Sequence, residues 1–275
     1  MLSPIEEKTI SKNQYKMKKI AIIGAGNMGS AIAASLEGRG YRVVCTAATS
    51  ATLEKLAESI PFASFSLSNA EAAEGADIVV LAVKPYIAPG VIEEIRGSLK
   101  DGAVIVSVIA ALSIAELAES LSSPGKRVEC FRVIPNTAIR YGKSVTFISH
   151  SPEADKGIVD EIESIFNLSG ESFIIPEKDM GACTALASCG IAYFLRFIRA
   201  AAEGSVELGL RAGFATKIAV LTAEGAAALL KGGSHPEAEI DKVTTPGGIT
   251  IRGLNALEDN GFTKAVIAAL RASVK

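Results

Sequence analysis

Short apolar runs rich in β-branched residues alternate with helical patterns in the N-terminal part of this chain. The runs that predict strands lie at residues 20–23, 42–45, 77–83, 103–108, 128–133 and 145–148. Residues 78–83 are apolar without alternation, which is typical of a strand buried on both faces. Between the runs, residues 31–37 and 52–59 predict helices. The alternation predicts an α/β fold in which helices cover a parallel sheet.

The pattern changes after about Pro176. Residues 177–208 and 215–231 are long, alanine-rich and free of strand signals. They predict a second, all-helical domain at residues 177–275, which follows a first domain at residues 17–176. The many alanines present small apolar surfaces that suit close helix packing, either in a dimer interface or in a core within one chain.

Residues 1–16 are polar and precede a second possible start at Met17. We interpret them as a flexible extension and leave them out of the fold prediction.

Charge and composition narrow the classes of partner. The chain carries 28 Lys and Arg against 30 Asp and Glu, and its basic residues are scattered, so no footprint for nucleic acid or an anionic membrane is present. Because Arg196, Arg199 and Glu203 interrupt the most apolar helical region, we expect no membrane helix. The four cysteines form no CxxC pair and there are two histidines, so no metal site is expected. These features predict a soluble, cytoplasmic protein that acts on a small molecule.

The first predicted strand runs into Gly24-Ala25-Gly26-Asn27-Met28-Gly29. In this Gly-x-Gly-x-x-Gly pattern the first glycine permits a tight turn, the second lets the backbone approach a pyrophosphate, and the third lets helix and strand come close. The following helix N-terminus offers free N–H groups to the phosphates. The motif predicts a Rossmann-type domain that binds a dinucleotide through Gly24, Gly26, Asn27, Met28 and Gly29.

The end of the second predicted strand indicates which dinucleotide is bound. An NAD site usually carries Asp or Glu there, but the first carboxylate in this stretch is Glu54, inside the next predicted helix. The hydroxyls of Thr46, Thr49 and Ser50 can donate to a 2′-phosphate, although the usual arginine is missing. The pattern favours NADPH and leaves NADH possible.

A second candidate site lies in residues 243–258. Thr245 and Pro246 before a periodic apolar stretch predict a helix start. Gly247 and Gly248 leave this start unobstructed, so its N–H groups can receive a carboxylate together with the hydroxyls of Thr245 and Thr250. The alternative is a helix start with only a structural role.

The chain resembles the pyrroline-5-carboxylate reductase family in several motifs that occur in the family's order. Residues 243–258 resemble the family signature, and the others are Ala82-Val83-Lys84-Pro85, Arg132-Val133-Ile134-Pro135-Asn136-Thr137, and Thr184-Ala185-Leu186 leading into Gly190-Ile191-Ala192-Tyr193. The resemblance implies a Rossmann domain followed by a helical dimerisation domain. It also implies hydride transfer from a reduced nicotinamide to C5 of a cyclic imine, which yields L-proline.

The resemblance assigns further residues to the site. Asn69 would contact the adenosine ribose, and Ala82, Val83, Lys84 and Pro85 would border the nicotinamide. The substrate-binding set would be Val243, Thr245, Gly248, Ile249 and Thr250. We expect Thr250 to orient the substrate as the catalytic residue. Lys84 is an alternative proton source or an exposed lysine without a role.

Some positions depart from the family pattern. Ala187-Ser188-Cys189-Gly190-Ile191-Ala192 stands where the family usually has Ser-Gly-Ser-Gly-Pro-Ala, Ala111 replaces a glycine, and Ala138 replaces a proline. These changes are either neutral drift or the mark of a paralogue with another imine substrate or reduced activity. The altered segment at residues 187–192 also leaves open a cofactor-binding regulatory protein. The 3-hydroxyacid dehydrogenase group fits less well, because its catalytic lysine has no counterpart after Gly190.

Overall fold

The computed structural model describes residues 17–274, so the predicted extension at residues 1–16 lies outside the described residues. Within that range the strands form one eight-stranded sheet in the order β3-β2-β1-β4-β5-β6-β7-β8. They are β1 (Lys19–Ile23), β2 (Arg42–Thr46), β3 (Ser64–Ser66), β4 (Ile78–Leu81), β5 (Ala103–Ser107), β6 (Val128–Ile134), β7 (Ser144–His150) and β8 (Gly170–Ile174).

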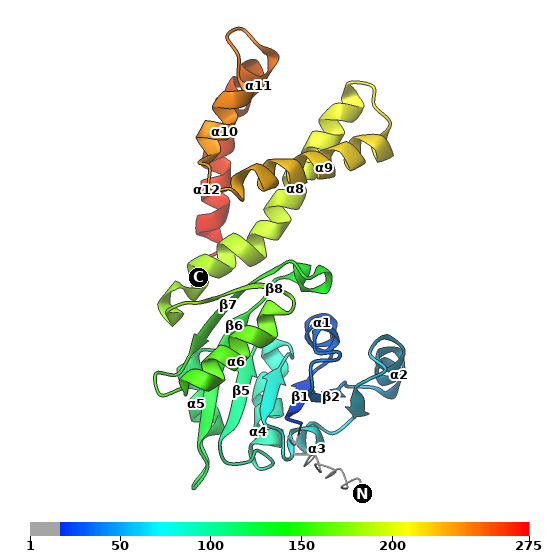
Figure 1. Cartoon of the computed structure of the whole chain (residues 1–275), viewed down its shortest axis with the longest axis vertical. Coiled ribbons are helices and arrows are strands. Elements are labelled where there is room, and N and C mark those ends of the chain that lie inside the picture. Colours follow the sequence, from blue (N-terminus) through cyan, green and yellow to red (C-terminus); the bar gives the residue numbers. More distant parts are fainter. Residues whose placement is uncertain (1–16, 275) are drawn as a thin grey trace, which may run out of the picture.

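Helices cover both faces of this sheet (Figure 1). One buried cluster contains side chains of α1 (Asn27–Ser35), α2 (Ser50–Ser59) and α6 (Lys156–Asn167). The other contains side chains of α3 (Asn69–Ala73), α4 (Ala88–Arg96) and α5 (Ile114–Leu121). Since both faces are covered, central strands such as β1, β4 and β5 are buried at every position. The predicted α/β layering is confirmed.

The sheet differs from the prediction in the direction of one strand pair and at its two edge strands. β6 and β7 pair antiparallel, whereas the other neighbouring strands pair in parallel. The short link through η2 (Thr137–Tyr141) accounts for this, because a parallel pair needs a longer crossover. The edge strands β3 and β8 escaped prediction, since Ser64, Ser66, Glu171 and Ser172 break their apolar pattern.

The chain from Glu177 to Ala272 is helical and extends away from the sheet (Figure 1). Its elements are η3 (Glu177–Asp179), α7 (Met180–Thr184), the π-helix η4 (Ala185–Cys189), α8 (Gly190–Glu207), α9 (Ala212–Leu230), α10 (Pro236–Val243), α11 (Ile249–Asp259) and α12 (Phe262–Ala272). We call residues 177–272 the helical arm. α12 returns to the base of the arm, where the Tyr193 hydroxyl hydrogen-bonds the Ser273 hydroxyl. The all-helical C-terminal region is confirmed.

The helical arm has almost no core of its own. Among residues 177–274 the buried positions are Met180, Ala185, Gly190, Ala202 and Ala215. Large apolar side chains are exposed instead, including Phe194 at 68%, Leu195 at 60% and Phe214 at 57%. Burial therefore argues against a core within one chain as the reason for the small apolar residues. An isolated chain would leave this surface in water, and large exposed apolar patches mark interaction sites.

We expected no helix that is apolar enough to cross a membrane. Judged by helix length and composition, this expectation is wrong. Two helical segments, Glu177–Glu207 and Ala212–Leu230, are long and apolar enough to cross one. The charges that we expected to interrupt the first segment cluster near its C-terminal end, at Arg196, Arg199 and Glu203, so an apolar window remains. Helices that pack against another protein surface share this length and composition.

Candidate dinucleotide-binding site

The glycine loop between β1 and α1 has the geometry that each glycine predicts. Gly24 has a φ of +88°, and a Cβ atom there would lie 2.6 Å from Cγ1 of Val83. A Cβ atom on Gly29 would lie 2.5 Å from the carbonyl oxygen of Gly24. Side chains are therefore excluded at both positions, by backbone conformation and by the close approach of helix and strand. The loop also lies against the end of β4, since its neighbour is Val83.

The open side of the loop is suited to an anion. Gly26 is the N-cap of α1, no side chain caps this helix, and a Cβ atom on Gly26 would meet nothing within 4 Å. Gly26 and Asn27 are exposed. The first N–H groups of a helix have no partner within it and carry a partial positive charge. A pyrophosphate can approach this backbone without meeting a side chain at Gly26.

Arg140 is a candidate site residue that the sequence analysis missed. Its guanidinium Nη2 donates a hydrogen bond to Oδ1 of Asn27 at 2.8 Å, across 113 positions of sequence. Arg140 lies in η2, after β6, and its other N–H groups are available beside the glycine loop. The structure brings a cation to the start of α1. No local signal predicts this contact, because it depends on the packing of η2 against α1, which lie far apart in the sequence.

Thr46 lies beneath the glycine loop. The Gly24 N–H donates to Oγ1 of Thr46 at 3.0 Å, and this hydroxyl donates to Oδ1 of Asn69 at 2.7 Å. The Ala25 N–H donates to the Thr46 carbonyl at 2.7 Å. Thr46 is 1% exposed and a hydroxyl has a single proton, so its donor capacity is used within the protein. Thr46 therefore positions the loop and does not offer a free donor to a 2′-phosphate.

The other predicted hydroxyls lie on the surface after β2. Thr49 is the N-cap of α2, and its hydroxyl accepts from the Thr52 N–H at 3.3 Å. Ser50 is the first residue of α2, and both residues are exposed. Their side chains remain accessible to a ligand.

The motif after β4 borders the same loop. The Ala82 N–H donates to the Ile23 carbonyl at 2.9 Å, which ties the end of β4 to the end of β1. Ala82 and Val83 are partly buried, whereas Lys84 and Pro85 are exposed at the start of η1 (Pro85–Ile87). The structure thus brings Ala82 and Val83 to Gly24 and Gly29. This places four of the predicted cofactor residues on one edge of the sheet.

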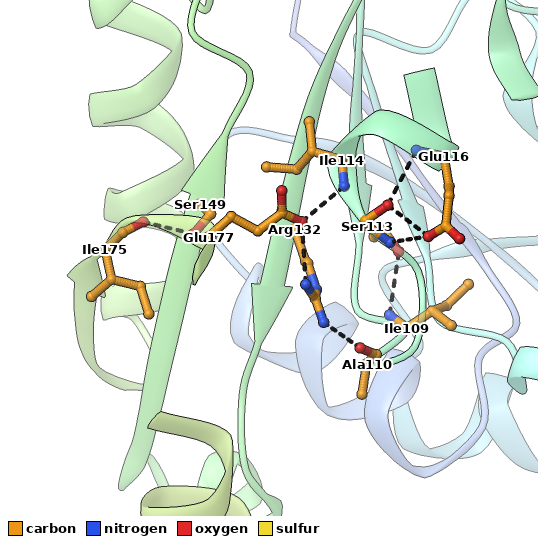
Figure 2. A network of polar contacts seen from close by, with 10 residues as sticks. Ile109, Ala110, Ser113, Ile114, Glu116, Arg132, Ser149, Ile175 and Glu177 are labelled. Carbon is orange, nitrogen blue, oxygen red and sulfur yellow. Dashed lines mark hydrogen bonds and ion pairs between the residues drawn. The ribbon is translucent and has the colours of Figure 1, made fainter. Parts of the chain in front are cut away.

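A polar network joins the helical arm to this edge (Figure 2). Glu177, the first residue of η3, accepts from Nη1 of Arg132 at 3.2 Å and from the Ile114 N–H at 2.9 Å. Nη2 of Arg132 donates to the Ala110 carbonyl in the loop after β5. Arg132 therefore holds that loop and the first residue of the arm at the same time.

The π-helix η4 overlaps the altered segment at residues 187–192, which continues into α8. Nδ2 of Asn136, in a side chain that is 4% exposed, donates to the Ala187 carbonyl at 3.1 Å. The Ser188 hydroxyl is buried and has no hydrogen-bond partner within residues 17–274. π-helical turns occur frequently at functional sites. The altered segment lies where the arm meets the sheet, next to the turn that follows β6.

The predicted substrate segment lies elsewhere. Val243 ends α10, Gly248 is the N-cap of α11, and Ile249 and Thr250 are exposed. The helix begins three residues after Pro246, because Gly247 turns with a φ of +71° and the Gly248 N–H donates to the Thr245 carbonyl at 2.9 Å. The loop between α10 and α11 lies at the end of the arm away from the sheet (Figure 1). One chain does not bring Thr245 or Thr250 to the glycine loop.

Two of the four cysteines, Cys45 and Cys130, are buried in the sheet domain. No group of three His, Cys, Asp or Glu residues that could hold a metal is present in the described part of the chain. Burial raises the pKa of the Cys45 thiol to about 12 and that of the Cys130 thiol to about 11. These two cysteines are therefore protonated core side chains at neutral pH.

Comparisons with known proteins agree with the site geometry. Residues 177–275 match the family described as pyrroline-5-carboxylate reductase dimerisation, and residues 19–111 match the family described as NADP oxidoreductase, coenzyme F420-dependent. A pyrroline-5-carboxylate reductase of Dictyostelium discoideum is 38% identical over 92% of this chain and 90% of its own length. The crystal structure of a Plasmodium falciparum pyrroline carboxylate reductase with NADP bound is 28% identical, has a TM-score of 0.82, and is matched over 93% of this chain and 95% of that one.

A pyrroline-5-carboxylate reductase structure from Coxiella burnetii gives the same result, with 27% identity, a TM-score of 0.84 and coverage of 94% and 96% of the two chains. These matches span both the sheet domain and the helical arm. The chain therefore belongs to the pyrroline-5-carboxylate reductase family.

Proposed function

We propose that this protein reduces 1-pyrroline-5-carboxylate to L-proline with NADPH as the hydride donor and NADH as a possible substitute. The observation that carries the proposal is a glycine loop with an uncapped helix N-terminus in a chain whose relatives are named pyrroline-5-carboxylate reductases over nearly its full length. The match to an NADP oxidoreductase family and the NADP bound to a structural relative support the cofactor.

The residues present fit a dinucleotide. The N–H groups at the start of α1 bind the pyrophosphate, and Arg140 neutralises part of its charge. Ala82, Val83, Lys84 and Pro85 border the nicotinamide end, because β4 ends beside β1. When bound, the reduced nicotinamide supplies a hydride. The protein's task is to align the imine carbon and to exclude water.

The chemical step needs little from side chains. Hydride adds to C5 of the imine, the π electrons of the C=N bond stay on nitrogen, and the nitrogen keeps the proton with which the iminium form arrives. Thr250 orients the substrate through its hydroxyl. Lys84, exposed at the end of β4, stays a second candidate for proton delivery when the neutral imine binds.

We further propose that two copies of the chain form each complete site. Thr250 and the glycine loop are apart in one chain, and the helical arm exposes Phe194, Leu195 and Phe214. The match of residues 177–275 to a dimerisation family supports a second copy as the partner of this surface. The start of α11 in one copy then faces the nicotinamide end in the other. A dimer would also bury the exposed apolar side chains of the arm, so that no membrane is required to shield them from water.

The substrate carboxylate fits the start of α11. No side chain caps this helix, and a Cβ atom on Gly248 would lie 2.6 Å from Oγ1 of Thr245, so a larger residue there would displace the Thr245 hydroxyl. The uncapped N–H groups and the Thr250 hydroxyl are suited to hold a small carboxylate. The relatives favour this reductase over a paralogue with another imine, a regulatory protein or a 3-hydroxyacid dehydrogenase.

A spectrophotometric assay tests the proposal. Purified protein is mixed with pyrroline-5-carboxylate and either NADPH or NADH, and the loss of nicotinamide absorbance is followed, with cofactor binding measured separately by calorimetry. Turnover with at least one cofactor is expected. A folded protein that binds cofactor and gives no turnover with either one contradicts the proposal. Light scattering on the same sample is expected to give at least twice the chain mass.

A further inference from the structure

A carboxylate from another part of the chain is linked to the end of β2 by hydrogen bonds, and the sequence pattern does not show it. In dinucleotide-binding folds an acidic residue near this point receives the 2′-hydroxyl of the adenosine ribose. Here the last residue of β2 is Thr46, and its hydroxyl is bonded to Oδ1 of Asn69 at 2.7 Å. Asn69 therefore lies at the end of β2, where that ribose is recognised in such folds.

Glu94 reaches Asn69 from the helix after β4. Its Oε2 accepts from Nδ2 of Asn69 at 2.8 Å, and its Oε1 accepts from the Asn69 N–H at 3.1 Å. Both oxygens of one carboxylate are thus directed at one residue. The β2 segment has no carboxylate of its own. Glu94, 48 positions after Thr46 in the sequence, is linked to Thr46 through Asn69.

The charge of Glu94 is not neutralised nearby. The ion pairs among the described residues do not include Glu94, whereas its neighbour Glu93 pairs with Arg96 at 2.8 Å. Glu94 is exposed, so its charge is accessible from solvent beside Asn69. A carboxylate accepts a hydrogen bond from a hydroxyl but repels a phosphate dianion.

We propose that Glu94 favours the 2′-hydroxyl of NADH over the 2′-phosphate of NADPH. Its charge thereby lowers the ratio of the NADPH affinity to the NADH affinity. This inference rests on the proposed function only in that the bound ligand is a nicotinamide dinucleotide. Asn69, held through its N–H, its Nδ2 and its Oδ1, presents Glu94 at a fixed place beside the ribose. NADPH still binds, but against the repulsion of this charge.

The test compares the affinities of NADP⁺ and NAD⁺ by calorimetry, without turnover, so its outcome is independent of whether the protein reduces an imine. Glu94→Gln keeps an acceptor for Asn69 and removes the charge. The ratio of the NADP⁺ affinity to the NAD⁺ affinity is expected to rise on the order of tenfold at low salt and less at high salt, as a screened charge effect requires. Glu94→Lys is expected to raise the ratio further.

Glu93→Gln is the matched control, because it removes the same charge from the same helix without touching Asn69. Its ratio is expected to stay at the wild-type value. Equal losses of both affinities in Glu94→Gln would overturn the proposal and leave Glu94 as a support for Asn69 alone. An equal shift in Glu93→Gln, or no shift in either variant, would also overturn it. Adenosine 2′,5′-bisphosphate and AMP, measured in the same way, must reproduce the shift, since they lack the nicotinamide end.

Discussion

Arg132 and Glu177 connect the sheet to the helical arm through an ion pair of 3.2 Å, and the same Glu177 oxygen accepts from the first N–H of α5. Their side chains are 18% and 32% exposed, so the pair is partly desolvated. Arg132 also holds the loop after β5 through the Ala110 carbonyl. One guanidinium therefore contacts both the first residue of the arm and the loop after β5.

Replacing Glu177 by Gln tests this link. The amide can still accept from Ile114, but the Arg132 charge loses its partner. We expect a loss of about 1–2 kcal/mol in the free energy of unfolding, between the values for exposed and buried pairs. Urea unfolding followed by circular dichroism measures it. Glu171→Gln, an exposed change on β8, is the control, and an equal effect of the two variants would show that the pair is not special.

Thr46→Val distinguishes two roles for this threonine. The valine leaves the Gly24 N–H without its side-chain acceptor and frees Oδ1 of Asn69. Because Thr46 supports the loop from below, we expect affinity for NADP⁺ and NAD⁺ to fall by a similar factor. We also expect stability to fall by about 1–3 kcal/mol. A selective loss of NADP⁺ binding would instead mean that the hydroxyl reaches the 2′-phosphate.

Arg140→Gln probes the cation beside the glycine loop. Loss of the charge near Asn27 is expected to weaken NADP⁺ and NAD⁺ alike, by roughly three- to tenfold, and the effect should shrink as salt rises. Calorimetry at two ionic strengths measures both features. Arg39→Gln removes an exposed charge in the segment between α1 and β2 and should leave binding unchanged. Unchanged binding in Arg140→Gln would remove Arg140 from the site.

Thr250→Val tests the substrate half of the site. We expect kcat/KM for the imine to fall at least tenfold, because the hydroxyl that orients the substrate is lost, while cofactor affinity stays near the wild-type value. Thr263→Val, which changes a helix-start threonine bonded to Glu258, serves as the control. An unchanged kcat/KM in Thr250→Val would exclude the assigned role.

The sequence predicted the parts of the molecule that depend on local patterns. Residues 20–23 and 78–81 are strands because their side chains are apolar at every position, as burial on both faces requires. Gly24 and Gly29 were assigned correctly as a turn and a close contact, since a positive φ and a short approach leave no room for a side chain. The switch to helices after residue 176 followed from composition.

The rest depends on contacts between distant segments. Arg140 reaches Asn27 because η2 packs against α1, and Glu94 reaches Asn69 because α4 packs against α3. The antiparallel pairing of β6 and β7 follows from a short connection, and apolar periodicity does not report strand direction. Thr46 looked free in the sequence because its two hydrogen-bond partners come from other elements.

The most direct test of the central claim follows the hydride itself. NADPH with deuterium at both C4 positions is incubated with pyrroline-5-carboxylate and the purified protein, and the product is analysed by mass spectrometry and chiral chromatography. We predict L-proline that carries one deuterium, located at C5. Proline without deuterium, or no proline from a protein that binds NADPH, would contradict the assignment of this chain as a reductase of the cyclic imine.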